Sequence, residues 1–137
     1  MGGSMTILLV EDDPDVQKFL LSHLDRVPQV VLDSVNSGSD ALGKSVLGNY
    51  DLVFLDLHLP DVGGLDILPV LRANLPRSVI AVISGYTDLV TEDDFEIADV
   101  VIAKPFDMPV IDELVSMARE IAERRQAIRE LGIGCED

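Results

Sequence analysis

The stretch Y-D-L-V-F-L-D-L-H-L-P-D-V-G-G, residues 50–64, decides the fold of this chain. Residues 52–55 form an apolar, β-rich run that is typical of a strand buried on both faces. The run ends on a carboxylate, Asp56, and Pro60 together with the two closing glycines prevents the strand from continuing. In open α/β sheets the carboxyl ends of the strands are where ligands bind. Asp56 is therefore either a simple cap of a turn or the centre of a functional site.

Four further strand-like segments accompany this one, and helical patterns lie between them. The predicted strands cover residues 6–10, 30–35, 52–57, 79–84 and 99–103. The predicted helices follow Pro14 and cover residues 37–47, 65–75 and 108–131, with a weak, strongly acidic segment at 87–99. Strands that alternate with helices through short loops predict an α/β fold with a parallel sheet. Right-handed crossovers then place the carboxyl ends of all the strands at one edge.

The composition is that of one folded domain. A chain of 137 residues, 47% of them hydrophobic, can bury one substantial core but not two. A net charge of −15 makes nucleic acid or an anionic membrane an unfavourable partner and is compatible with a cation or a basic protein surface. We find no apolar run that could span a bilayer and no signal peptide. The single cysteine, Cys135, excludes an internal disulfide and fits a reducing cytoplasm.

The domain is expected to occupy residues 5–131, after a cloning remnant at residues 1–4 and before a flexible tail at 132–137. Its last helix, residues 108–131, would be roughly 36 Å long, about twice the length of a typical strand. The second half of that helix should therefore project past the sheet, as a linker or a frayed tail rather than a dedicated dimer contact. The apolar stripe predicted to pack on the sheet consists of Ile111, Leu114, Ala118 and Ile121.

Carboxylate, hydroxyl and ammonium side chains lie at or just after the ends of the predicted strands, at the edge that the strands share. Glu11 and Asp12 follow the first strand, Asp56 ends the third, Ser84 ends the fourth and Lys104 follows the fifth. Converging carboxylates repel one another and call for a cation, and such hard oxygen ligands suit Mg²⁺ rather than zinc. With a lysine and a hydroxyl alongside, this set could hold a phosphoryl group, with Asp56 as the nucleophile. Each residue alone also fits a plain role at a helix or strand end, and only their joint occurrence favours a site.

Four motifs together resemble the receiver domain of bacterial two-component response regulators over residues 5–131. They are L-L-V-E-D-D-P at 8–14, D-L-V-F-L-D-L-H-L-P-D-V-G-G at 51–64, V-I-S-G at 82–85 and K-P-F at 104–106. The resemblance implies a flavodoxin-like (βα)5 three-layer sandwich with a parallel sheet in the order 2-1-3-4-5. It also implies that Asp56 is the phosphoacceptor and that Ser84 and Lys104 complete the catalytic set.

The resemblance further implies an Mg²⁺ site, which Mn²⁺ could also fill. Its ligands would be Asp12, Asp56 and Glu11, with the backbone carbonyl of His58. The phosphoryl donor would be a sensor histidine kinase or a histidine phosphotransfer protein, and the signal would pass to a downstream protein or an output domain. The domain itself would not be an enzyme beyond self-phosphorylation and slow self-dephosphorylation. It would contact neither nucleic acid nor membrane and could form a weak homodimer.

The sequence departs from the family at the positions that switch or modulate the site. Val101 stands where the family usually has a Tyr or Phe, so the usual aromatic coupling is in doubt. Tyr86 and His58 lie two residues past Ser84 and Asp56, and in the family these positions set the hydrolysis rate. A bulky Tyr86 would shield the phosphoryl group, although both side chains could equally face solvent. The acidic segment 87–99 is predicted to be partly irregular and to order on phosphorylation.

Three other interpretations remain. A degenerate receiver could serve as a docking module without phosphorylation. A cobalamin-binding module is suggested by the start of a D-x-H-x-x-G motif at Asp56, but Asp61 stands at the glycine position. A haloacid dehalogenase-type phosphatase would need a second Asp where this chain has His58.

Overall fold

In a computed structural model of the chain, the structure describes residues 4–85 and 91–132. Five parallel strands form one sheet in the order β2-β1-β3-β4-β5, which confirms the predicted topology. The strands are β1 (Met5–Val10), β2 (Val30–Val35), β3 (Leu52–Asp56), β4 (Val79–Ser84) and β5 (Val100–Ala103). The helices in the described part are α1 (Pro14–Leu24), α2 (Gly38–Leu47), α3 (Gly64–Asn74), α4 (Glu92–Ile97) and α5 (Met108–Arg129).

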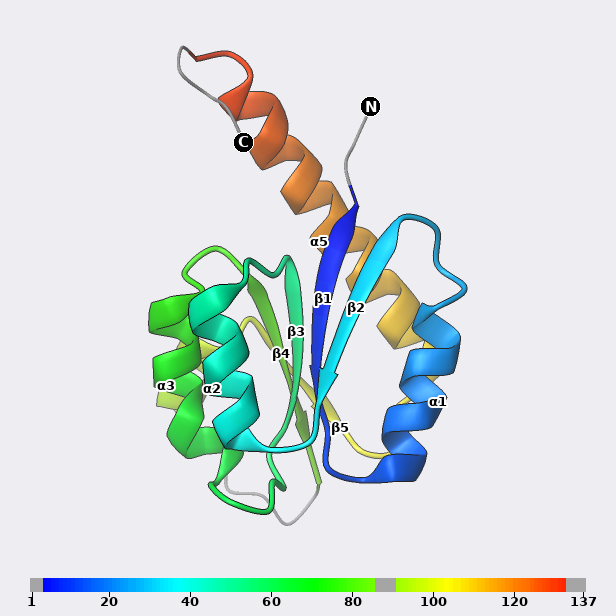
Figure 1. Cartoon of the computed structure of the whole chain (residues 1–137), viewed down its shortest axis with the longest axis vertical. Coiled ribbons are helices and arrows are strands. Elements are labelled where there is room, and N and C mark those ends of the chain that lie inside the picture. Colours follow the sequence, from blue (N-terminus) through cyan, green and yellow to red (C-terminus); the bar gives the residue numbers. More distant parts are fainter. Residues whose placement is uncertain (1–3, 86–90, 133–137) are drawn as a thin grey trace.

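Helices cover both faces of the sheet, so the core has two halves (Figure 1). Successive side chains of a strand point to opposite faces, and here both faces are apolar. In β1, Leu8 and Val10 pack toward α2 and α3, whereas Ile7 and Leu9 pack toward α1 and α5, and all four are fully buried. This explains why the strands are continuous apolar runs in the sequence. No helix among residues 4–85 and 91–132 is long and apolar enough to cross a membrane.

Helix α5 packs on the sheet with a different stripe from the predicted one. Its buried residues are Ile111, Val115 and Ala118, whereas Leu114 is only partly buried and Ile121 is 38% exposed. The prediction for Ile121 was wrong because the helix leaves the sheet near this residue. The second half of α5 projects past the end of the sheet, as expected from its length (Figure 1).

The acidic segment before β5 forms a short helix in its described part. Residues 86–90 lie outside the described residues, and α4 begins after Thr91. The Oγ1 of Thr91 accepts a hydrogen bond from the backbone N–H of Asp94, and the Asp94 carboxylate accepts one from the backbone N–H of Thr91. This capping box, with acidic residues at the positive end of the helix dipole, stabilises a helix that propensity alone does not favour.

Candidate functional site

Three of the predicted site residues meet at the carboxyl edge of the sheet. Glu11 directly follows β1, Asp56 ends β3 and Lys104 directly follows β5. Glu11 is 0% exposed and Asp56 is 2% exposed. The Nζ of Lys104 lies 2.8 Å from Oδ2 of Asp56 and 3.9 Å from Oε1 of Glu11. The site is therefore a pair of buried carboxylates that shares one ammonium group.

Backbone hydrogen bonds hold these residues in place. Asp56 pairs with Ile83 in the register of β3 and β4, and the backbone N–H of Lys104 donates to the carbonyl oxygen of Ser84 at 2.9 Å. The backbone N–H of His58 donates to Oδ1 of Asp56 at 2.9 Å. Both carboxylate oxygens of Asp56 are thus engaged. The peptide bond between Lys104 and Pro105 is cis.

The pKa values of the two carboxyl groups are shifted in opposite directions. Burial raises the pKa of Glu11 well above its usual range, and the neighbouring Asp56 carboxyl adds to this rise. Burial alone would raise the pKa of Asp56 as well, but the neighbouring Glu11 carboxyl and the hydrogen bonds from Lys104 and the His58 N–H outweigh burial and lower it. Burial opposes the charge of Lys104, yet the contact with Asp56 raises the pKa of the ammonium group. Asp56 is therefore the ionised member of the pair and the better nucleophile.

The residues at this edge fit a hard divalent cation. Oε2 of Glu11 accepts a hydrogen bond from the backbone N–H of Asp13 at 3.1 Å, whereas the buried Oε1 has no hydrogen-bond partner in the described residues. A buried carboxylate oxygen without a partner is costly unless a cation or a donor completes it. Within the described ranges, no three His, Cys, Asp or Glu side chains are grouped as a metal site. Any cation would thus rely on the Glu11 and Asp56 carboxylates, the exposed Asp12 and the carbonyl group of His58.

The remaining predicted residues lie around this centre. Ser84 is buried at the end of β4, and its hydroxyl donates to the carbonyl oxygen of Gly85 at 3.1 Å. Val101 pairs with Val82 and is half-buried against the core half that contains α2 and α3. The side chain of His58 is exposed. Tyr86 lies outside the described residues.

Sequence reasoning missed the role of Asp61. Its carboxylate accepts hydrogen bonds from the first two N–H groups of α2, those of Gly38 at 2.8 Å and Ser39 at 2.9 Å. These two bonds lower the pKa of Asp61. The loop after Asp56 is thereby tied to the start of α2. The sequence signal was limited to a single carboxylate, Asp61, shortly before the two glycines at 63 and 64.

Gly64 allows α3 to begin directly against the end of β3. A Cβ atom at this position would lie 2.6 Å from Cα of Leu57 and 2.9 Å from the carbonyl oxygen of Asp56. Both are backbone atoms, which cannot move aside as a flexible side chain can. The absence of a side chain at Gly64 therefore permits the close packing that positions Asp56.

The variant Glu11→Gln should be more stable than the parent protein in metal-free buffer, by about 1–3 kcal/mol at mildly alkaline pH. The folded protein binds a proton on Glu11 more tightly than the unfolded chain does, so its stability falls as the pH rises from the ordinary value of 4.5 towards the raised pKa. Glutamine does not titrate and avoids this loss. Chemical denaturation with EDTA, at mildly acidic and mildly alkaline pH, measures the difference.

The exposed Glu113→Gln substitution on α5 is the matched control and should leave the stability unchanged at both pH values. Added Mg²⁺ should reduce the advantage of Glu11→Gln, because the cation compensates the parent carboxylates. A Glu11→Gln variant that was less stable than the parent at both pH values would contradict the electrostatic account.

The chain is similar in sequence to a known protein family and to curated proteins. Residues 7–116 match the family model described as the response regulator receiver domain. Response regulator ArlR from Staphylococcus aureus is 37% identical over 121 residues, covering 87% of this chain and 53% of the relative. The chain thus spans about half the length of the curated relatives it matches.

Solved structures show the same similarity. A CheY-like receiver domain from Methylobacillus flagellatus has a TM-score of 0.75 and 30% identity, covering 85% of this chain and 99% of that one. The response regulator TrrA from Thermotoga maritima, solved in complex with Mg²⁺ and BeF, has a TM-score of 0.74 and 28% identity, covering 83% and 98% of the two chains. TrrA has also been solved in complex with the histidine kinase ThkA.

Proposed function

Because this chain belongs to the family of response regulator receiver domains, we propose that it accepts a phosphoryl group on Asp56 in two-component signalling. The donor would be the phosphohistidine of a sensor histidine kinase or of a histidine phosphotransfer protein. The observation that carries the proposal is the buried Asp56 carboxylate, held 2.8 Å from the Lys104 ammonium and beside Glu11.

The proposed reaction is a transfer of the phosphoryl group between two side chains. A carboxylate oxygen of Asp56 attacks the phosphorus, the bond from phosphorus to the donor imidazole nitrogen breaks, and an acyl phosphate forms. The lowered pKa of Asp56 keeps this nucleophile ionised at neutral pH. Mg²⁺, when bound, would neutralise charge on the phosphoryl oxygens.

The residues around Asp56 would stabilise the product. The Lys104 ammonium already contacts Oδ2 of Asp56 and would move with it to a phosphoryl oxygen. Ser84 ends the neighbouring strand, so a turn of its hydroxyl toward the phosphoryl group would add one donor. A structurally similar chain, TrrA, has been solved with Mg²⁺ and BeF, which supports this use of the edge.

The partners follow from the same proposal. Phosphorylation would change the face formed by β4, α4, β5 and α5, and the signal would pass to a downstream protein or to an output domain. The domain would act in the cytoplasm, without direct contact with nucleic acid or membrane, and with at most a weak homodimer. It would catalyse only its own phosphorylation and slow dephosphorylation. The solved complex of TrrA with the kinase ThkA supports a kinase as the donor.

Intact mass spectrometry after incubation with acetyl phosphate tests the proposal. The protein should gain the mass of one phosphoryl group in the presence of Mg²⁺ and none in EDTA, because the buried carboxylates otherwise repel the incoming anion. A gain that did not depend on Mg²⁺ would contradict the metal site. A failure to gain mass, combined with a failure to bind beryllofluoride, would favour the docking module without phosphorylation.

A further inference from the structure

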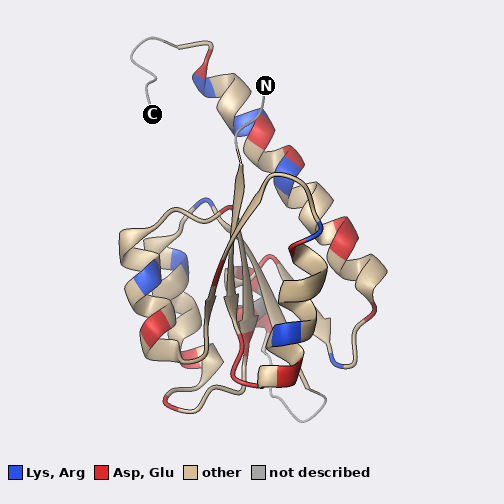
Figure 2. Cartoon of the chain, turned by 45° about the vertical axis from the view of Figure 1, so that its right-hand side comes forward, with Lys and Arg blue, Asp and Glu red and all other residues tan. Residues whose placement is uncertain are grey.

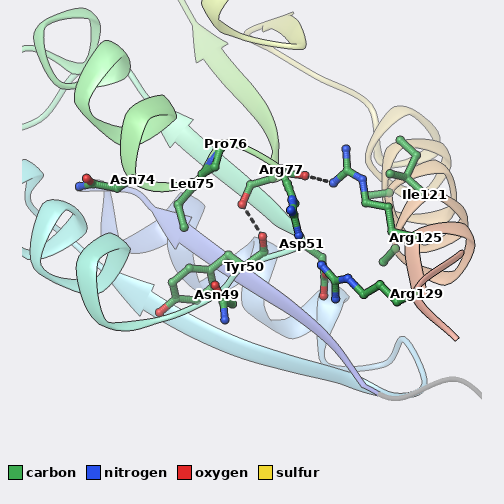
Figure 3. Close-up of a pocket in the computed structure, with 13 residues that line it drawn as sticks. Asn49, Tyr50, Asp51, Asn74, Leu75, Pro76, Arg77, Ile121, Arg125 and Arg129 are labelled. Carbon is green, nitrogen blue, oxygen red and sulfur yellow. Dashed lines mark hydrogen bonds between the residues drawn. The ribbon is translucent and has the colours of Figure 1, made fainter. Parts of the chain in front are cut away.

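A cavity of about 570 Å³ lies at the amino-terminal end of the sheet, opposite the candidate site. Three segments of the chain line it: residues 49–51 before β3, residues 74–78 before β4, and the part of α5 from Ala118 to Arg129. Figure 3 shows Arg77 facing Arg125 and Arg129 of α5 across this cavity. The proposed phosphorylation chemistry uses none of these residues.

The cavity gathers positive charge on an acidic protein. Three of the ten basic residues of the chain, Arg77, Arg125 and Arg129, line it, although the net charge is −15. Basic and acidic residues alternate along the projecting half of α5 in Figure 2, while acidic residues gather at the opposite end of the sheet. Asp51 is the one acidic group among the described lining residues, so the lining has a formal charge of about +2. An anion is therefore attracted to the cavity lining and repelled from the acidic carboxyl edge of the sheet.

Two of the three guanidinium groups are available to a ligand. Arg125 donates through Nη1 to the carbonyl oxygen of Arg77, which ties α5 to the loop before β4. The side chains of Arg77 and Arg129 make no hydrogen bond or ion pair with any residue in the described ranges. By contrast, Arg72 and Arg124 each pair with a carboxylate. Asp51 is partly engaged, because its Oδ2 accepts a hydrogen bond from the N–H of Thr6 at 2.9 Å.

The rest of the lining suits an organic group. Pro76, before β4, and Ile121, on α5, contribute apolar surface on opposite walls, and Tyr50 also lines the cavity. Small-molecule sites typically have volumes of about 300–1,000 Å³ and combine such apolar walls with a few polar groups. Walls from three segments make a pocket rather than a flat surface, which favours a small molecule over an acidic protein segment.

We propose that this cavity binds an organic phosphate of nucleotide size. Guanidinium groups bind phosphate through paired hydrogen bonds, so Arg77 and Arg129 would hold the phosphate groups from opposite walls. Ile121 and Pro76 would contact the organic part. A ligand that bridges the loop and α5 would fix the direction in which the projecting half of α5 leaves the domain.

Calorimetric titration of the full chain with ADP, in EDTA and without Mg²⁺, tests the proposal. Saturable binding of one ADP is expected, and Arg77→Gln or Arg129→Gln should weaken it about tenfold each, since a hydrogen-bonded charge is lost. The control is Arg124→Gln, an exposed arginine of α5 that is not among the lining residues, and it should change the affinity less than about twofold. Asp56→Asn should bind ADP as the parent does, which separates this site from the proposed phosphoacceptor.

Several outcomes would overturn the proposal. The absence of saturable ADP binding would exclude the site, and an equal loss in Arg124→Gln would reduce it to general charge attraction. If pyrophosphate bound as tightly as ADP, the organic part of the ligand would contribute nothing to binding, and the proposed contacts with Ile121 and Pro76 would be wrong. Binding of an acidic peptide in place of ADP would make the cavity a protein-docking surface.

Discussion

Asp56→Asn should gain no phosphoryl group from acetyl phosphate and Mg²⁺, under conditions in which the parent protein gains one. An amide oxygen is a poor nucleophile and cannot form the acyl phosphate, and Asp56 is the carboxylate that both Lys104 and the His58 N–H engage. Intact mass measures the loss. The control is Asp66→Asn, an exposed carboxylate in the first turn of α3, which should be phosphorylated as the parent is.

The loss should not result from unfolding. In metal-free buffer Asp56→Asn relieves the repulsion between two buried carboxylates and leaves Lys104 to pair with Glu11, now 3.9 Å away. The thermal midpoint of the variant should therefore equal or exceed that of the parent protein. A folded variant that still gained the phosphoryl mass would place the acceptor on another residue.

Lys104→Gln should slow the phosphorylation of Asp56 about a hundredfold, which is the usual cost of removing one electrostatic stabiliser of a transferring group. The Lys104 ammonium is the only described cationic group within ion-pair distance of Asp56 and Glu11. Its loss leaves the developing charge on the phosphoryl oxygens without a cation from the protein to neutralise it. The measurement is the rate of mass gain from acetyl phosphate at saturating Mg²⁺, with the exposed Lys44→Gln of α2 as the control.

The pH dependence separates this role from a purely structural one. The hydrogen bond from Lys104 lowers the pKa of Asp56, so its removal should raise that pKa and leave less of the nucleophile ionised. Raising the pH should therefore restore part of the rate in Lys104→Gln and little in the parent protein. Two results would contradict this role: an unchanged phosphorylation rate in Lys104→Gln, or a reduced rate that does not recover as the pH rises. Lys104 would then serve only to neutralise the carboxylates of the unphosphorylated site.

The sheet and most of the site were predictable because they depend on short-range patterns. Strands buried on both faces are continuous apolar runs, and parallel topology forces their carboxyl ends to one edge. These two rules suffice to bring Glu11, Asp56 and Lys104 together from positions far apart in the sequence. The exact bounds of β1, β3 and β5 differ from the prediction by one residue each, since strand ends depend on local pairing.

Features set by contacts between distant segments were not predictable. Helical periodicity does not reveal which of Leu114 and Val115 faces the sheet, because the choice depends on how α5 lies across the strands. The capping box of α4 is an exception, because it joins Thr91 and Asp94, only three positions apart, and sequence reasoning overlooked it in a segment judged by its acidic composition. The cavity at the amino-terminal end brings together Arg77 and Arg129, which are 52 positions apart in the sequence, and nothing local in either segment predicts this.

The bridge from Asp61 to α2 gives the protein a built-in spectroscopic reporter. The amide protons of Gly38 and Ser39 are donated to a carboxylate that is carried by the loop after Asp56. Any displacement of that loop changes the length of these two bonds and hence the chemical shifts and exchange rates of the two amides. A change at the edge that carries Asp56 should therefore be readable by NMR at the start of a helix that contributes no residue to that edge.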